Sequence, residues 1–180
     1  MVKKILFITS NLGIEHAALI EPLEHLKAAD FQVIHATEHK SDIETVEDNI
    51  KPAFRYPSEY SYDDINPHDF VALVLPGGIA NADSIRVHPQ VIQLVQHFAD
   101  TGKLIATTGH AAWVLINAER IQGKTLSTST NIHLDLKHAG GTLQESTVYQ
   151  CNQQGWSLIS TCHIDDFEDF TQKIIQALNQ

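Results

Sequence analysis

The stretch LIATTGHAAWVL, residues 104–115, has the pattern of a buried strand, a tight turn and the start of a helix. Many α/β hydrolytic enzymes hold a nucleophile at such an elbow, with backbone N–H groups directed at the reaction centre. A nucleophile is expected immediately before His110, but Gly109 occupies that position. The chemistry available to the elbow therefore depends on whether another group takes the place of the nucleophile.

The elements that would position this elbow alternate along the chain. Short apolar runs predict strands at residues 3–9, 31–36, 69–75, 103–107, 125–128, 148–150 and 157–160. Apolar residues at helical spacing predict helices that contain Leu19, Leu23 and Leu26, then Val91, Leu94, Val95 and Phe98, and further helices at 111–118, 132–138 and 167–178. Alternation of this kind predicts a doubly wound α/β sandwich with a mainly parallel central sheet, formed by one domain over residues 1–180.

Three local features carry more specific expectations. Pro22 suits the first turn of a helix better than its interior, so residues 15–20 are expected to form a separate turn or a kinked first turn. Residues 38–68 contain three prolines and are expected to form a long excursion with one short strand or hairpin, over the sheet or at a subunit contact. Asp165 or Asp166 is expected to cap the last helix.

Ligands of doubly wound sheets bind outside the carboxyl ends of the strands. Three predicted loops fall there, at residues 11–15, 76–81 and 108–111. Backbone N–H groups in the last two loops would form an oxyanion-type cradle, which we assign to Gly77, Gly78, Gly109, His110 and Ala111. An equally weighted alternative is that the three glycines only serve tight turns.

Composition excludes several classes of function. The net charge of −10 argues against nucleic acid or an anionic membrane as a partner. No apolar run is long enough to span a bilayer, and the N-terminus lacks a cleavage site, so we expect a cytoplasmic protein. The 11 histidines are scattered and the two cysteines form no CxxC pair, so neither a metal nor a cofactor is expected. Dinucleotide, P-loop and serine-hydrolase motifs do not occur.

Several motifs in order, DFVALVLPGG, NADSIR, HPQVIQLVQHFADTGKLIA, GHAAWVL and LSTSTNIHLDLKHAGG, resemble the ThiJ/PfpI family. The similarity covers nearly the whole chain. The family includes PfpI-type intracellular proteases, Parkinsonism-associated deglycases and bacterial general stress proteins. The resemblance implies a flavodoxin-like sandwich that forms a homodimer or a higher homo-oligomer.

The resemblance also implies roles for individual residues. Glu15 matches the family's glutamate after the first strand, and His110 matches the histidine after the elbow cysteine. Gly109 stands where that cysteine is expected. Asp83 is the nearest match to an acidic residue that can orient the histidine from a neighbouring subunit. Loss of a covalent nucleophile can lower kcat by about 10⁶, whereas glycine relieves the backbone strain of an elbow.

Other groups could take over the chemistry. Cys162 precedes the last helix, in a loop that approaches the site in the family, although a free, half-buried thiol is the simpler interpretation. Glu15 and His110 could polarise a water molecule. A metal held by Glu15, His110 and a third ligand, such as Asp83 or a loop histidine, is a further alternative.

The resemblance, together with Gly109 at the elbow, implies a stress-related protein of the ThiJ/PfpI type that is inactive or weakly active and binds a small carbonyl or carboxylate ligand. The alternative is an active hydrolase or a glyoxalase- or deglycase-like enzyme that uses Glu15, His110 and water, or Cys162. A third alternative is a structural or partner-binding module that uses residues 38–68.

Overall fold

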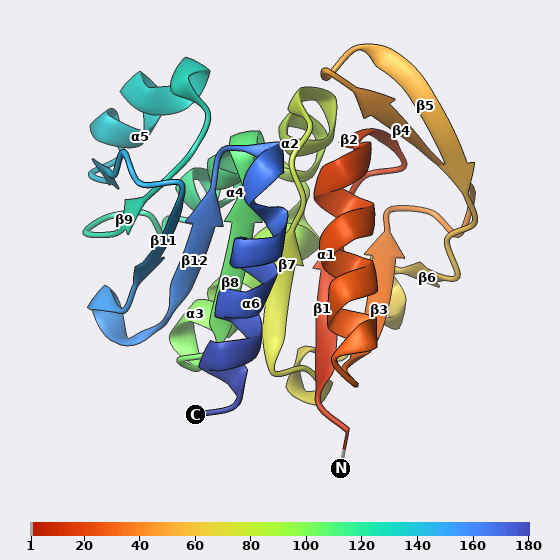
Figure 1. Ribbon diagram of the computed structural model, residues 1–180, viewed down its shortest axis with the longest axis horizontal. Helices are drawn as coiled ribbons and strands as arrows, with labels where there is room; N and C mark the ends of the chain where they lie inside the picture. Colours follow the sequence, from red (N-terminus) through yellow and green to blue (C-terminus); the bar gives the residue numbers. More distant parts are fainter. Residues whose placement is uncertain (1) are drawn as a thin grey trace.

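The computed structural model describes residues 2–180, except for the side chain of Ile164. Its central sheet contains β1 (Lys4–Ile8), β3 (Gln32–Thr37), β6 (Tyr60–Ser61), β7 (Ala72–Leu75), β8 (Leu104–Thr108), β11 (Val148–Cys151) and β12 (Leu158–Thr161). The strand order is β11–β12–β8–β7–β1–β3–β6 (Figure 1). Within this sheet the pairing is parallel except between β11 and β12. The predicted mainly parallel sheet is therefore confirmed.

Helices cover both faces of the sheet. Helices α1 (His16–Ala28) and α6 (Phe167–Leu178) lie together on one face, and α3 (Pro89–Asp100) and α4 (Ala112–Asn117) lie on the other (Figure 1). Alternate residues of β1 serve the two layers: Ile5 and Phe7 belong to the core under α1 and α6, whereas Leu6 and Ile8 belong to the core under α3 and α4. A strand buried on both faces must be continuously apolar, which explains the unbroken runs in the sequence.

The first helix differs from its prediction. Helix α1 begins at His16 and continues through Pro22, which lies inside the helix and is buried. Proline at this depth removes a hydrogen bond from the helix. The apolar stripe of α1 compensates by packing against the sheet, so tertiary contacts override the local preference of proline. Residues before the helix, expected as a loop, contain the short strand β2 (Leu12–Glu15).

The excursion at residues 38–68 contains a hairpin, as predicted. Strands β4 (Ile43–Glu47) and β5 (Lys51–Tyr56) are antiparallel, and β4 also pairs with β2 to form a separate three-stranded sheet. Asp48 and Asn49 occupy the turn with φ values of +52° and +64°, which suits the twist of a tight hairpin. The turn of the hairpin lies beyond the carboxyl end of β1 (Figure 1), whereas Ile43 and Tyr56 at its open end pack into the core under α1 and α6.

The remaining elements are short. Helix α2 (Ile79–Ile85) follows the PGG turn and was not predicted. Strands β9 (Thr125–Leu126) and β10 (Thr142–Leu143) pair with each other beside α5 (His133–His138). The side chain of Asp166, at the N-cap of α6, makes no capping hydrogen bond and instead accepts one from the Thr161 hydroxyl at 3.4 Å. Within the described part of the chain, no helix has the length and apolar character needed to cross a bilayer.

Candidate functional site

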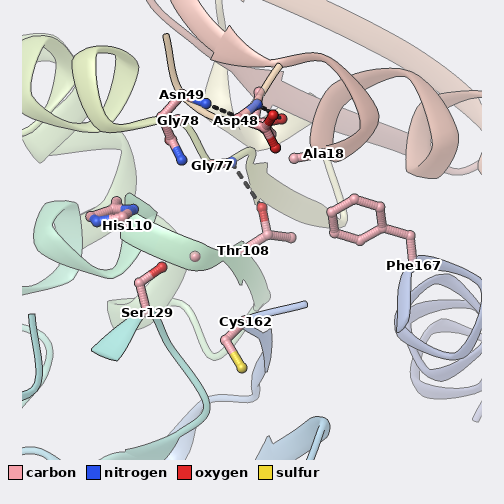
Figure 2. Close-up of a pocket in the computed structure, with 12 residues that line it drawn as sticks. Ala18, Asp48, Asn49, Gly77, Gly78, Thr108, His110, Ser129, Cys162 and Phe167 are labelled. Carbon is pink, nitrogen blue, oxygen red and sulfur yellow. Dashed lines mark hydrogen bonds between the residues drawn. The ribbon is translucent and has the colours of Figure 1, made fainter. Parts of the chain in front are cut away.

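A pocket of about 160 Å³ lies at the carboxyl ends of β1, β7 and β8 (Figure 2). All three loops expected at this edge contribute to it, because neighbouring parallel strands end side by side. Four further segments complete the wall: the β4–β5 turn, helix α1, the loop after β9 and the segment between β12 and α6. The lining residues are Glu15, Ala18, Asp48, Asn49, Gly77, Gly78, Thr108, Gly109, His110, Ser129, Cys162 and Phe167.

The elbow has the geometry that its sequence predicts. Strand β8 ends at Thr108, Gly109 has a φ of +52°, and a single 3₁₀ turn over Gly109–Ala111 leads into α4. A Cβ placed on Gly109 would lie 3.3 Å from the Oγ of Ser129. Glycine adopts this backbone conformation without steric cost, and any other residue would be strained. A side chain at position 109 would project toward Ser129.

The two glycines of the PGG loop have different roles. A Cβ on Gly78 would lie 2.3 Å from the carbonyl oxygen of Gly13, and the φ of Gly78 is +113°, so only glycine fits there. The N–H of Gly77 donates to the Oγ1 of Thr108 at 2.8 Å, so it is already engaged within the protein. Among the described residues no acceptor is found for the N–H of Gly78. Gly78 is therefore the better candidate of the two as a donor to a ligand.

Asn81 fixes the PGG loop against the first strand. Its side chain is fully buried. The Oδ1 accepts from the backbone N–H of Ser10 at 2.8 Å, and the Nδ2 donates to the carbonyl oxygen of Pro76 at 2.8 Å. This role was not predicted, although Asn81 is part of the NADSIR motif. Because the buried amide of Asn81 forms hydrogen bonds with the segment after β1 and with the PGG loop, it holds the two segments in one relative position.

Glu15 joins the pocket to the hairpin. Its two carboxylate oxygens accept from the backbone N–H groups of Asp48 at 3.2 Å and Asn49 at 3.0 Å. The side chain of Asn49 then accepts from the N–H of Ile79, at the start of α2, at 3.0 Å. Carboxylate-to-amide hydrogen bonds of this kind are stronger than neutral ones. Glu15 thus has a structural function at the rim of the pocket, and sequence reasoning missed both turn residues.

His110 is almost completely buried, with 6% of its surface exposed. Burial lowers its pKa below the ordinary value, because an imidazolium would be poorly solvated there. The ring meets Trp113 edge-on, with centroids 5.5 Å apart. The imidazole is therefore neutral near pH 7 and can act as a hydrogen-bond donor and acceptor or as a general base.

Two predicted site residues lie outside this pocket. Ala111 is fully buried in the elbow and does not line the cavity. Asp83 is on the outer side of α2, where its carboxylate accepts from Arg86 at 2.9 Å and remains largely exposed. Its role across a subunit contact stays a prediction. The metal set Glu15, His110 and Asp83 is not assembled, and the described residues hold no cluster of three potential metal ligands.

Cys162 and Ser129 occupy the wall opposite the PGG loop. Figure 2 shows the Ser129 hydroxyl directed at the elbow, whereas the sulfur of Cys162 is directed away from Gly78 and His110. No hydrogen-bond partner is found for the Ser129 hydroxyl among the described residues. Ser129 was not predicted as a site residue, because it lies 20 positions beyond the elbow in a serine- and threonine-rich loop.

The fold and this pocket define a doubly wound α/β protein with a glycine elbow at the carboxyl edge of its sheet. The chain belongs to the DJ-1/PfpI family, whose sequence pattern matches residues 3–177. It is 31% identical over 137 residues to the deglycase PfpI of Pyrococcus furiosus, covering 76% of this chain and 78% of that protein. It is 29% identical over 120 residues to general stress protein 18 of Bacillus subtilis, covering 67% of each.

A comparison with solved structures supports the fold. DJ-1beta of Drosophila melanogaster superposes with a TM-score of 0.87 at 22% identity, covering 99% of this chain and 91% of that one. At this identity the likeness establishes the fold alone. Family membership, expected from the ordered motifs, and the doubly wound fold are both confirmed.

Proposed function

We propose that this protein is a stress-related member of the DJ-1/PfpI family that binds a small carbonyl compound and has little or no thiol-dependent catalysis at its elbow. The observation that carries the proposal is Gly109, which stands in the pocket wall between Thr108 and His110 at a φ of +52°. The surrounding pocket supplies groups that can bind a carbonyl oxygen. The name of the Bacillus relative supports the stress-related role.

The charges in the wall favour a carbonyl over a carboxylate ligand. Among the residues that the structure describes, neither a lysine nor an arginine lines the pocket, whereas Glu15 and Asp48 do. His110 carries no charge to compensate them near pH 7, since burial lowers its pKa. An anion would lose its hydration and gain no partner of opposite charge. Helix α4 has only six residues, so the dipole at its N-terminus contributes little positive potential that could attract an anion.

The deglycase name of the Pyrococcus relative supports a second candidate, a weak deglycase- or glyoxalase-like or hydrolytic activity. In that case His110 would accept a proton from a water molecule that Glu15 also polarises. Cys162 is the alternative attacking group because it lines the same pocket. Both carboxylate oxygens of Glu15 are engaged by the hairpin, which leaves this residue less available as a base and favours the binding function.

Methylglyoxal consumption and small-peptide hydrolysis by the purified protein test the two candidates. The comparison includes Gly109→Cys, Glu15→Gln and Cys162→Ser, with binding measured in parallel. We expect the unmodified protein to bind without turnover and Gly109→Cys to gain turnover. Turnover by the unmodified protein that Glu15→Gln or Cys162→Ser abolishes would establish the enzyme instead. If Glu15→Gln changes only affinity or stability, the binding function stands.

We also propose that the protein is a cytoplasmic homodimer. Ile50 and Phe54 of the hairpin expose 78% and 54% of their surfaces, and exposed apolar side chains of this size favour association. The third function, a partner-binding module, would use the same hairpin. Light scattering on the protein and on Phe54→Ser tests the dimer: we expect twice the chain mass for the former and a lower mass for the latter if the hairpin takes part.

A further inference from the structure

A second cavity adjoins the candidate site. It has a volume of about 610 Å³, compared with about 160 Å³ for the first. Four residues line both cavities: Asn49, His110, Ser129 and Cys162. A molecule seated at the elbow can therefore extend past Ser129 into the larger space. The second cavity is partly open to solvent.

Most of the residues that line the second cavity carry hydroxyl, amide or imidazole groups, although the surface that they present to it is more apolar than polar. Its members outside the shared four are Ser127, Thr128, Thr130, Asn131, His133, Leu143, Gln144, Glu145 and His163. The Thr128 hydroxyl is engaged, since it donates to the carbonyl oxygen of Gly109 at 2.6 Å. The side-chain amide of Gln144 and the hydroxyl of Ser129 have no hydrogen-bond partner among the described residues. These two groups can bind a ligand without breaking contacts within the protein, whereas the Oδ1 of Asn131 accepts a hydrogen bond from the Thr130 hydroxyl at 3.3 Å.

Charge narrows the class of ligand. In the part of the chain that the structure describes, the lining of the two cavities contains three carboxylates, Glu15, Asp48 and Glu145, and neither lysine nor arginine. A phosphate or carboxylate group in this space would meet like charge without a cation to neutralise it. Uncharged hydroxyl groups, in contrast, can both donate to and accept from serine, threonine, asparagine and glutamine side chains.

We infer that the second cavity is a subsite for the hydroxylated chain of an uncharged carbonyl compound, such as an open-chain sugar. The carbonyl end would lie at Gly78 and His110, and the hydroxylated carbons would pass Ser129 toward Asn131 and Gln144. This inference rests on the proposed carbonyl-binding function and adds the class of ligand. Asn131 and Gln144 are its specificity-determining residues, because they line the larger cavity and not the smaller one.

A series of open-chain ketones tests the subsite. Hydroxyacetone, dihydroxyacetone and erythrulose carry one, two and three hydroxyl groups on similar chains, and dihydroxyacetone phosphate supplies an anion. Dissociation constants come from NMR titration of the ¹⁵N-labelled protein, which also reports whether His110 and Gln144 shift. We expect erythrulose to bind about tenfold more tightly than hydroxyacetone, since each hydroxyl gained adds a modest net hydrogen bond. Dihydroxyacetone phosphate should bind more weakly than dihydroxyacetone.

Variants separate this subsite from the elbow pocket. The double variant Asn131→Leu, Gln144→Leu should reduce erythrulose affinity to that of hydroxyacetone and leave hydroxyacetone unchanged. Gln176→Leu, on the exposed side of α6, is the matched control and should alter neither. The subsite proposal is wrong, and carbonyl binding stands, if hydroxyacetone binds but all three ketones have the same dissociation constant. The same holds if dihydroxyacetone phosphate binds most tightly. If none of the ketones shifts His110, both proposals fail.

Discussion

The hydroxyl oxygen of Ser129 lies 3.3 Å from the point that a Cβ on Gly109 would occupy. This separation is tight for a Cβ contact, so a side chain at position 109 would require Ser129 to move by a few tenths of an ångström. The position of the Ser129 hydroxyl therefore suits an elbow residue that has no side chain. The pair explains why a change at position 109 affects stability as well as chemistry.

Gly109→Cys should be less stable than the unmodified protein by about 1–2 kcal/mol, because a residue with a side chain is strained at positive φ and also meets Ser129. Gly109→Ala should lose a similar amount, since both changes add a Cβ. Adding Ser129→Gly to Gly109→Cys should recover part of the loss. Urea unfolding measures all three. Equal or greater stability of Gly109→Cys would contradict the strain assigned to this elbow.

Glu15→Gln should loosen the hairpin tip. The carboxylate now accepts from two backbone N–H groups, whereas an amide keeps only one acceptor oxygen and brings a competing donor. The loss of a charged acceptor should cost about 1–2 kcal/mol. Hydrogen exchange should become faster at Asp48 and Asn49 and stay unchanged in β7. Glu21→Gln, at an exposed position of α1, is the control and should leave exchange at Asp48 and Asn49 unchanged. If these two amides exchange at the same rate in Glu15→Gln as in the control, Glu15 does not hold the tip of the hairpin.

Much of the site followed from the sequence because parallel strands end at one edge. The apolar runs at β1, β7 and β8 alone predict that Glu15, Gly78, Gly109 and His110 lie at that edge. The contact between Glu15 and the hairpin turn could not be predicted, because backbone N–H groups leave no side-chain pattern. Pro22 misled the prediction of α1, since packing against the sheet offset its local cost.

Ser129 was missed for a different physical reason. Its loop follows β9, a two-residue strand that is too short to give a clear periodic signal. The placement of the loop depends on tertiary contacts, such as the Thr128 hydroxyl donating to the carbonyl oxygen of Gly109. Loop residues positioned in this way can be predicted from the sequence only once the neighbouring strands are known.

Stability should fall in acid because of His35. This residue on β3 is hydrogen-bonded to the Thr9 hydroxyl at 2.7 Å, and burial, reinforced by Lys27, lowers its pKa from 6.5 to about 4. The folded state thus binds a proton less readily than the unfolded state. Its contribution to stability is complete above pH 6.5 and is lost as the pH falls toward 4, by up to about 3 kcal/mol.

Unfolding free energies between pH 4 and pH 7 measure this effect. The difference between the unmodified protein and His35→Leu should change through that window, because the variant lacks the titrating group. His138→Leu, an exposed residue of α5, should keep the slope of the unmodified protein. A pH-independent difference between the unmodified protein and His35→Leu would show that His35 titrates normally in the folded state.

Lys124 should make the protein more stable as the pH rises through the alkaline range. Its side chain is fully buried, and its ammonium group donates to the carbonyl oxygens of Gln153 and Trp156, the latter at 2.7 Å. Burial lowers its pKa from 10.5 to about 8, against a smaller opposing effect of Cys151. Below pH 8 the folded state bears the cost of a buried charge. Because the folded protein loses this proton first, stability should rise between pH 8 and 10.5, by up to about 3 kcal/mol.

Lys124→Met isolates this contribution. The variant leaves two carbonyl groups without their donor, so we expect it to be less stable than the unmodified protein at every pH. The gap should widen between pH 8 and 10.5, since only the unmodified protein gains stability there. Lys137→Met, at an exposed position of α5, should show no such widening. Chemical unfolding measures the difference in unfolding free energy between the two proteins. If that difference stays constant from pH 8 to 10.5, Lys124 keeps an ordinary pKa, and its two hydrogen bonds fully offset the desolvation of the charge.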